Sequence, residues 1–299
     1  MTHKCPYCDS ESSLYLRSQD YNRRVTPETF DHFQCPHCEL IFLAPLPSNL
    51  GSYYPQTYHS IPNASSYLET ASALERYKID LVMRHVRKGR LLEIGSSYGM
   101  FAYLAKKEGF DVEAIEMNTE CCAFLRRVVG VKAINSAEPV TVLQRTEPYD
   151  VIALWHVIEH MTDPWSMLDA ICAALAPGGI CVLASPNPEA WQFRVMGRYW
   201  PHLDAPRHVM LIPMQLLQQK MAAANMKTVL ATTTDQGSIG WNSFGWEFLF
   251  ANSMPGHHPY IQRALRLAGK CMGMCFGPIE RREGKGSAYT MIFQRDVAG

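Results

Sequence analysis

Two apolar segments are each followed by residue types that suit a ligand carrying a nucleoside. The segment LLEI, residues 91–94, leads into a turn that contains Gly95 and Gly99, and the segment VEAIE ends on the acid Glu116. Glycines in such a turn allow the backbone to approach a ligand closely, and an acid after the next strand accepts hydrogen bonds from ribose hydroxyls. The sequence therefore predicts a nucleoside-binding site at the carboxyl ends of neighbouring strands.

The spacing of this turn argues against a dinucleotide, because a pyrophosphate is bound by G-x-G-x-x-G at a helix N-terminus. Here Glu93 lies two residues before Gly95, and Ser97 and Gly99 follow. An acid at 93 would repel a pyrophosphate but suits a ligand with an ammonium and a sulfonium. The pattern resembles motif I of class I S-adenosylmethionine (SAM)-dependent methyltransferases, with Ser97 in place of the middle glycine. A tight turn without a ligand is the alternative for this motif by itself.

This resemblance implies SAM as cofactor and extends to residues beyond the turn. In the family pattern Glu116 binds the ribose, Met117 covers one face of the adenine, and Ser136 and Ala137 flank it. The resemblance covers residues 75–235 and the C-terminal strand.

Alternating strands and helices must position these residues. Asp150 to Trp155 is predicted to be a buried parallel strand. A helix follows from about Pro164, with Asp163 as its N-cap, and Ala176–Gly179 is expected to end it with a left-handed glycine cap. This alternation predicts an α/β fold with a doubly wound parallel sheet.

The same resemblance implies a Rossmann-like, mostly parallel sheet closed by a final antiparallel strand. Residues 227–234 and 288–295 are expected to form the closing pair, and residues 236–285 lie between them as an insertion. The methyltransferase domain is predicted at 76–299.

Four cysteines near the N-terminus predict a structural zinc site. They form two C-P-x-C knuckles, Cys5 with Cys8 and Cys35 with Cys38, and the spacing resembles a zinc ribbon over residues 1–45. A redox pair and an iron–sulfur cluster are the alternatives. Four thiolates leave no open position for catalysis. Because Glu39 tolerates left-handed geometry less well than Asp9, we expect the second knuckle to be distorted.

Residues 46–75 are predicted to be a loop-like connector, because they are rich in Pro, Ser, Asn and Tyr. Their tyrosines Tyr53, Tyr54 and Tyr58 either cover the cofactor pocket or pack the two domains together. A zinc ribbon, a Y-Y-P-x-x-Y segment and a methyltransferase domain together resemble bacterial enzymes that act on sugars and small metabolites.

Three histidines are candidate catalytic residues. His156 and His160 follow the predicted strand 150–155, and His208 lies in the aromatic segment 199–213. A base is needed where the methyl acceptor is a hydroxyl or an acidic carbon. The H-x-x-E-H order at 156–160 matches a zinc peptidase pattern, but it straddles a strand end and a helix start, so we reject that function.

A second metal is an alternative at this segment. Ubiquinone-pathway O-methyltransferases carry a similar E-x-x-E-H segment that is implicated in divalent metal binding. This chain keeps Glu159 and His160 but has His156 at the first acid, which disfavours a hard cation. The interpretation we favour is that His156 borders the methyl-transfer site, while Glu159 and His160 pack the helix start.

Composition limits the possible partners. The 299 residues carry no net charge, with 28 basic and 28 acidic residues, so no global attraction to nucleic acid is expected. No signal peptide and no membrane-spanning run is visible, which predicts a cytoplasmic protein. Residues 258–277 have Arg263, Arg266 and Lys270 at helical spacing and could contact a membrane surface or a lipid-linked substrate. A cap over the substrate pocket or a dimer surface is the alternative we favour.

The expected reaction is SAM-dependent methyl transfer to a small metabolite, with a sugar or glycan precursor as first choice. The alternatives are an RNA methyltransferase that uses the zinc ribbon to bind RNA, an enzyme for a quinone- or lipid-like substrate, and a catalytically silent binding protein. The ribbon has few basic residues, namely Lys4, Arg17, Arg23 and Arg24, which disfavours RNA binding. Glu93, Gly95 and Glu116 are all present, which disfavours a silent protein.

Overall fold

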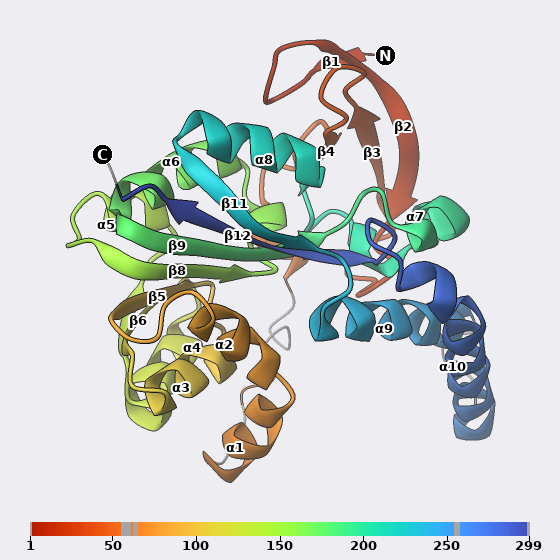
Figure 1. Ribbon diagram of the computed structural model, residues 1–299. Coiled ribbons are helices and arrows are strands. Elements are labelled where there is room, and N and C mark those ends of the chain that lie inside the picture. The colour runs from red at the N-terminus through yellow and green to blue at the C-terminus, as the bar shows by residue number, and fades with distance from the viewer. Residues whose placement is uncertain (1, 55–60, 62–64, 254–257, 298–299) are drawn as a thin grey trace.

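The computed structural model describes residues 2–54, 61, 65–253 and 258–297. In this part of the chain a seven-stranded sheet lies between two layers of helices, and a five-stranded sheet built mainly from the N-terminus packs beside it (Figure 1). Two long helices near the C-terminal end of the chain extend away from the large sheet (Figure 1).

The large sheet has the order β11-β12-β9-β8-β5-β6-β7. Strands β5 to β9 run parallel, and β12 is antiparallel to both of its neighbours. The expected α/β sheet with a final antiparallel strand is therefore confirmed. The strands are β5 (Arg90–Ile94), β6 (Asp111–Glu116), β7 (Lys132–Asn135), β8 (Tyr149–Trp155), β9 (Leu175–Pro186), β11 (Met226–Thr232) and β12 (Ala288–Arg295).

Each face of this sheet buries the alternate side chains of its strands. Leu91 and Val151 pack with α2, α3 and α4, whereas Leu92 and Ile152 pack with α6 and α8. These helices are α2 (Arg76–Met83), α3 (Met100–Lys107), α4 (Thr119–Phe124), which continues as the π-helical turn Leu125–Val129, α5 (Pro139–Leu143), α6 (Pro164–Ala174), α7 (Trp191–Met196) and α8 (Met214–Ala223). Short 3-10 turns span Ile158–His160, Gly197–Tyr199 and Pro201–Leu203.

The small sheet has the order β1-β2-β3-β4-β10. Its last strand, β10, lies more than 160 residues after β4 in the sequence. Met210 of β10 pairs with Phe42 of β4. Phe33 and Phe42 belong to the same apolar core as Ile152 of the large sheet, so the two sheets share one core. The strands are β1 (Thr2–Lys4), β2 (Glu11–Gln19), β3 (Thr29–Gln34), β4 (Ile41–Leu43) and β10 (Met210–Leu211). The domain limits 1–45, 46–75 and 76–299 stay predictions.

Two local predictions from the sequence are wrong. The connector is not all loop, because it contains a 3-10 turn, Leu50–Tyr53, and the helix α1 (Ser65–Ala73), which buries Leu68 and Ser72. Helix α6 ends at Ala174 with the extended residue Leu175 as its C-cap, so no left-handed glycine caps it. Gly178 does have a positive φ of 78°, but it lies within β9.

The insertion between β11 and β12 consists of α9 (Gln236–Ser253) and α10 (Pro259–Glu280). A β-carbon on Gly269 of α10 would lie 2.7 Å from the backbone of Trp246 and Glu247 in α9. The two helices therefore approach closely because glycine occupies this position. Within the described residues, none of the helices is long and apolar enough to cross a bilayer.

Candidate active site and metal centre

The turn between β5 and α3 has unusual backbone geometry. Gly95, Ser97 and Gly99 all have positive φ angles, of 72°, 49° and 82°. A β-carbon on Gly95 would lie 2.6 Å from the side chain of Val157, and one on Gly99 would clash with Leu125. Ser97 adopts the left-handed conformation although it is not glycine, at a cost of about 1–2 kcal/mol. The turn thus keeps its shape despite the serine at its centre.

Glu116 lies at the end of β6 and faces this turn. Its Oε2 accepts a hydrogen bond from the Ser97 N–H and its Oε1 accepts one from the Asn118 N–H, both at 2.8 Å. Each carboxylate oxygen has two lone pairs, so each keeps one for a ribose hydroxyl. The donor and acceptor chemistry of this edge therefore fits the ribose of SAM.

Glu93 lies beneath the turn rather than beside the ligand position. Its carboxylate is buried and accepts a hydrogen bond from the Ala102 N–H of α3 at 3.1 Å. Burial raises the pKa of Glu93 to about 8, although the charge of Lys78 opposes the shift. In this structure Glu93 supports the start of α3, and direct contact with the ligand's ammonium stays a prediction.

The residues predicted to hold the adenine lie at the same sheet edge. The Met117 side chain is 69% exposed, a high value for an apolar residue that follows a buried strand. The Ser136 N–H donates to the Glu116 carbonyl at 3.1 Å, so the turn containing Ser136 and Ala137 is tied to the end of β6. The Met117 thioether and the turn of small residues at Ser136 and Ala137 therefore suit a planar ring. Their contacts with adenine stay a prediction.

His156 directly follows β8 and has a positive φ of 58°. Its Nδ1 lies 3.4 Å from Oε1 of the fully buried Glu159. Burial alone would raise the pKa of Glu159, but the neighbouring His156, His208 and His160 lower it to about 2, so this carboxylate is ionised. Ser185 Oγ donates to its other oxygen at 3.2 Å. A buried carboxylate next to an imidazole is an arrangement that stabilises a protonated histidine.

The other two candidate histidines, His160 and His208, lie next to each other. The rings of His160 and His208 are 4.5 Å apart. Each Nδ1 lies near a backbone carbonyl, that of Arg207 at 3.0 Å for His160 and that of His202 at 2.8 Å for His208. Because a carbonyl only accepts, Nδ1 carries the proton in this pairing and Nε2 carries the lone pair. Burial, together with the charge of His208, lowers the pKa of His160 to about 4.

The structure also brings a second set of metal-ligating atoms together. Glu159, His160 and His208 offer ligand atoms within 4.8 Å of one another. The sequence singled out the first two for a possible divalent cation, and the fold adds His208. A cation at this place stays a prediction.

An aromatic wall beside His156 comes from the insertion. The Trp241 ring lies 4.8 Å from the His156 ring, 5.1 Å from His202 and 5.5 Å from Phe244. The segment 241–250, WNSFGWEFLF, is rich in aromatic residues, but nothing in the sequence indicates that Trp241 meets His156. That contact depends on α9 lying across the carboxyl end of β8.

A buried ion network, which the sequence did not reveal, supports the segment that carries His208. The Arg207 side chain is fully buried and binds Asp20 at 2.5 Å and Asp204 at 2.7 Å. It also donates to the Tyr53 carbonyl at 3.1 Å. An arginine that follows a proline in the segment 199–213 gives no sequence signal of its partner, since Asp20 is far away along the chain.

The tyrosines of the connector have different positions. The Tyr53 hydroxyl donates to Glu28 at 2.7 Å and its ring packs on Phe30, so it joins the connector to the small sheet. The Tyr54 hydroxyl lies 3.0 Å from His160 Nδ1, at the candidate site. Whether these tyrosines cover the cofactor pocket or pack the domains together stays a prediction, and Tyr58 lies outside the described residues.

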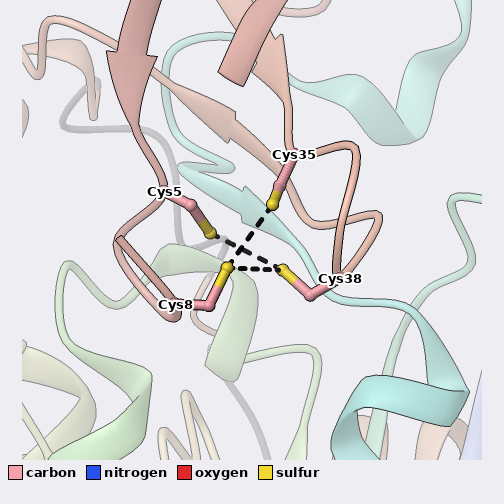
Figure 2. A group of neighbouring side chains, drawn as sticks. All are labelled: Cys5, Cys8, Cys35 and Cys38. Atoms are coloured by element: carbon pink, nitrogen blue, oxygen red, sulfur yellow. Dashed lines mark hydrogen bonds between the residues drawn. The ribbon is translucent and has the colours of Figure 1, made fainter. Parts of the chain in front are cut away.

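The four predicted metal ligands converge at one point (Figure 2). The sulfur–sulfur distances are 3.6 Å for Cys5–Cys38, 3.5 Å for Cys8–Cys35 and 3.8 Å for Cys8–Cys38. Zn–S bonds of about 2.3 Å place the sulfurs of a regular tetrahedron about 3.8 Å apart. The four cysteines therefore fit a zinc ion.

The expected distortion of the second knuckle is wrong. Asp9 and Glu39 have nearly equal φ angles, of 58° and 60°. The N–H of each donates to the carbonyl of its first cysteine, Cys5 or Cys35, at 3.0 Å. The turn hydrogen bonds thus hold Glu39 in the left-handed conformation as well as they hold Asp9.

Comparison with known proteins identifies relatives. A family model described as a methyltransferase domain matches residues 67–231. The ubiquinone biosynthesis O-methyltransferases of Photorhabdus laumondii and Psychrobacter arcticus are 28% and 29% identical to this chain, and each match covers 36% of it. The matches cover 48% and 46% of those enzymes, so the chain spans about half the length of the curated relatives it matches.

Two solved structures share the fold. One is a SAM dependent methyltransferase from Archaeoglobus fulgidus, with a TM-score of 0.51, 14% identity, and coverage of 75% of this chain and 94% of that chain. The other is the cyclopropane synthase MmaA2 from Mycobacterium tuberculosis, with a TM-score of 0.50, 12% identity, and coverage of 73% and 83%. Identities this low establish similarity of fold.

Proposed function

This chain belongs to the methyltransferase domain family, and we propose that it transfers a methyl group from SAM to a hydroxyl of a small, quinone-like aromatic molecule. The curated relatives, which are named for ubiquinone biosynthesis, support this acceptor over the sugar that was our first choice. The turn at 95–99 and Glu116 provide the cofactor site.

In the structure, one observation supports this acceptor class, the aromatic surface beside His156. Trp241, Phe244 and His202 form a ring cluster at the end of β8. A sugar requires many polar partners for its hydroxyls, whereas flat apolar rings bind an aromatic ring through stacking and edge contacts. The ring cluster therefore favours an aromatic acceptor.

His156 acts as the general base and Glu159 positions it. When bound, SAM supplies an activated methyl group, so the residues of the chain must orient the acceptor and remove its proton. With the Nδ1–H of His156 facing Glu159, its Nε2 carries the lone pair that accepts the hydroxyl proton. The ionised carboxylate then stabilises the imidazolium that forms. His160 and His208 are the reserve candidates.

Methyl transfer to defined acceptors tests this proposal. We expect 4-ethylcatechol to gain a methyl group in the presence of SAM, as seen by mass spectrometry, and nucleotide sugars to stay unmodified. The His156→Asn variant should lower kcat by about 100-fold or more, while its affinity for SAM, measured by calorimetry, is unchanged. The variant His85→Asn, at an exposed histidine, is the matched control. Methylation of sugars alone would show that the acceptor class is wrong.

A structural zinc ion in the N-terminal cluster is part of the proposal, whereas RNA is not. Of the basic residues in this region, Arg17 pairs with Asp31 and Arg24 donates to the Asn252 carbonyl. These internal partners leave less positive charge for phosphates. A cytoplasmic location remains the prediction from the sequence.

Peripheral membrane contact through residues 258–277 also remains a prediction, beside a cap over the substrate pocket or a dimer surface. Tyr260, Leu267 and Met274 of α10 are 77%, 62% and 70% exposed. Arg263 and Arg266 are exposed on the adjacent side of the helix. Apolar side chains flanked by basic ones suit an anionic bilayer surface.

Sedimentation with vesicles tests this contact. The protein should pellet with vesicles of phosphatidylcholine and phosphatidylglycerol, and high salt should release it because the charges are screened. The Leu267→Ser variant should bind less. Protein that stays in the supernatant with every vesicle would exclude the contact.

A further inference from the structure

A row of aromatic side chains leads away from the candidate methyl-transfer site along α9. Trp241, Phe244 and Phe248 are three and four residues apart and lie on one side of the helix. Their rings form a continuous series that begins at His156, with centroid distances of 4.8, 5.5 and 5.1 Å. Seven residues of α-helix span about 10 Å. An apolar row of this length therefore leads from the site along α9 to Phe248.

This row is open to solvent in the part of the chain that the structure describes. Phe244 is 41% exposed, and Trp241 and Phe248 are half-buried. Contiguous exposed aromatic residues are uncommon on soluble proteins and mark binding surfaces. Their packing alone does not explain them, because the opposite side of α9 already holds Trp246 in the core between Trp191 and Phe276.

The row ends in a cavity of about 900 Å³ between α9, the loop after β2 and the turn at Tyr199. Phe248, Leu249 and Phe250 line it from α9, and Tyr21 and Tyr199, whose rings are 4.9 Å apart, line it from the other side. The volume lies in the range of small-molecule sites, roughly 300–1,000 Å³.

Most polar groups in the wall of this cavity have partners within the protein, but the buried amide nitrogen of Asn252 has none among the described residues. Asp20 binds Arg207 and accepts hydrogen bonds from the N–H groups of Arg23 and Val25. The Asn22 amide donates to Asp204 and to the Pro201 carbonyl, both at 2.6 Å. With these groups satisfied, the cavity offers a ligand mainly apolar surface.

We infer that this cavity binds an apolar chain, of the alkyl or isoprenoid class, carried by the acceptor molecule. The acceptor's aromatic ring lies at His156 and Trp241, and its chain follows Phe244 and Phe248 into the cavity. The inference rests on the proposed aromatic acceptor, and it adds a second site that selects substrates by the length of their chain.

Binding of 4-alkylcatechols, from ethyl to decyl, tests the inference on the full-length protein without SAM. Calorimetry should show the affinity rising by about fourfold per methylene, the value expected for a buried CH₂ group. The rise should stop where the cavity is filled. The Phe248→Ala variant should lose at least tenfold in affinity for decylcatechol and leave ethylcatechol binding unchanged.

The matched control is Leu74→Ala, at an exposed leucine between α1 and α2 that does not line the cavity. Affinity that does not depend on chain length, or a Phe248→Ala variant that weakens both catechols equally, would overturn the inference. The series on the unaltered protein decides the question even if the variant does not fold.

The outcomes separate the cavity from the proposed function. If long chains bind through Phe248 but no catechol is methylated, the proposed acceptor hydroxyl is wrong and the cavity assignment holds. If ethylcatechol is methylated and longer chains bind no better, the proposed function holds and the cavity assignment is wrong.

Discussion

At the scale of single residues, the turn between β5 and α3 depends on Gly95. Its φ of 72° disfavours any side chain, and a β-carbon would lie 2.6 Å from Val157. We expect Gly95→Ala to reduce the affinity for SAM by at least about tenfold, since left-handed strain costs roughly 1–2 kcal/mol before the clash is added. Calorimetry on the folded variant measures the loss.

The matched control for this change is Gly240→Ala in α9. This glycine has no positive φ and open space at its β-carbon position. It should keep the SAM affinity of the unaltered protein. If both variants bound SAM equally well, the turn would not be part of the cofactor site.

Glu93 should make stability depend on pH. Its pKa is about 8 in the folded protein against 4.5 for an ordinary glutamate. Between these values the folded state holds a proton that the unfolded state has lost, so the free energy of unfolding falls as the pH rises. The loss is on the order of 1.4 kcal/mol per pKa unit. Urea unfolding at pH 5 and pH 8 measures it.

The Glu93→Gln variant keeps an acceptor for the Ala102 N–H and cannot ionise. It should therefore be more stable than the unaltered protein at pH 8, and the difference should shrink at pH 5. Glu147→Gln, at an exposed position, is the control and should leave the pH slope as it is. An unchanged slope in Glu93→Gln would assign the dependence to other groups.

At the scale of elements, the cysteine cluster should stabilise more than its own knuckles. The small sheet shares a core with the large one, and Tyr7 of the first knuckle contacts Trp165 of α6 at a ring distance of 4.6 Å. Loss of a structural zinc ion removes folding free energy from the ribbon. We expect Cys35→Ser to lower the melting temperature by roughly 5–15 °C and to remove the metal.

Mass spectrometry for metals and calorimetric melting measure these two effects. Cys275→Ser changes an exposed cysteine of α10 and should affect neither. One zinc ion per chain in the unaltered protein is the expected stoichiometry, and its absence from well-folded protein would rule the metal out.

At the scale of the whole molecule, Arg207 joins three distant parts of the chain. It binds Asp20 of the N-terminal region, Asp204 beside it and the carbonyl of Tyr53 in the connector. Removing one partner of a buried ion pair costs about 3–5 kcal/mol, because the remaining charges stay unpaired. Arg207→Met should lose this amount in urea unfolding, whereas Arg17→Met, in an exposed pair with Asp31, should lose at most about 1 kcal/mol.

The same network should contribute to unfolding in acid. Burial raises the pKa values of Asp20 and Asp204, but Arg207, together with the backbone N–H donors to Asp20 and the histidines near Asp204, outweighs it. The net shift is downward from 3.8. A depressed pKa gives stability that is present above pH 3.8 and is lost as the pH falls through the folded values. The Arg207→Met variant should lack this loss in acid, and a variant with the same acid profile as the unaltered protein would contradict the assignment.

The sequence by itself determined the α/β sheet, the glycine-containing turn after β5 and the cysteine cluster. Each depends on residues that are close along the chain, such as Gly95 and Gly99 or Cys35 and Cys38, so spacing and periodicity carry the information. Where local hydrogen bonds decided the outcome, as at Glu39, propensity alone was misleading, because the turn compensates for the cost of a left-handed residue.

Only the tertiary structure decided which side chains meet around the site. His156 meets Trp241, His160 meets His208 and Arg207 meets Asp20 across long stretches of chain. Such contacts depend on how the insertion and the small sheet pack on the large sheet. No local pattern encodes that packing, because burial and shape select the partners only once the elements are assembled.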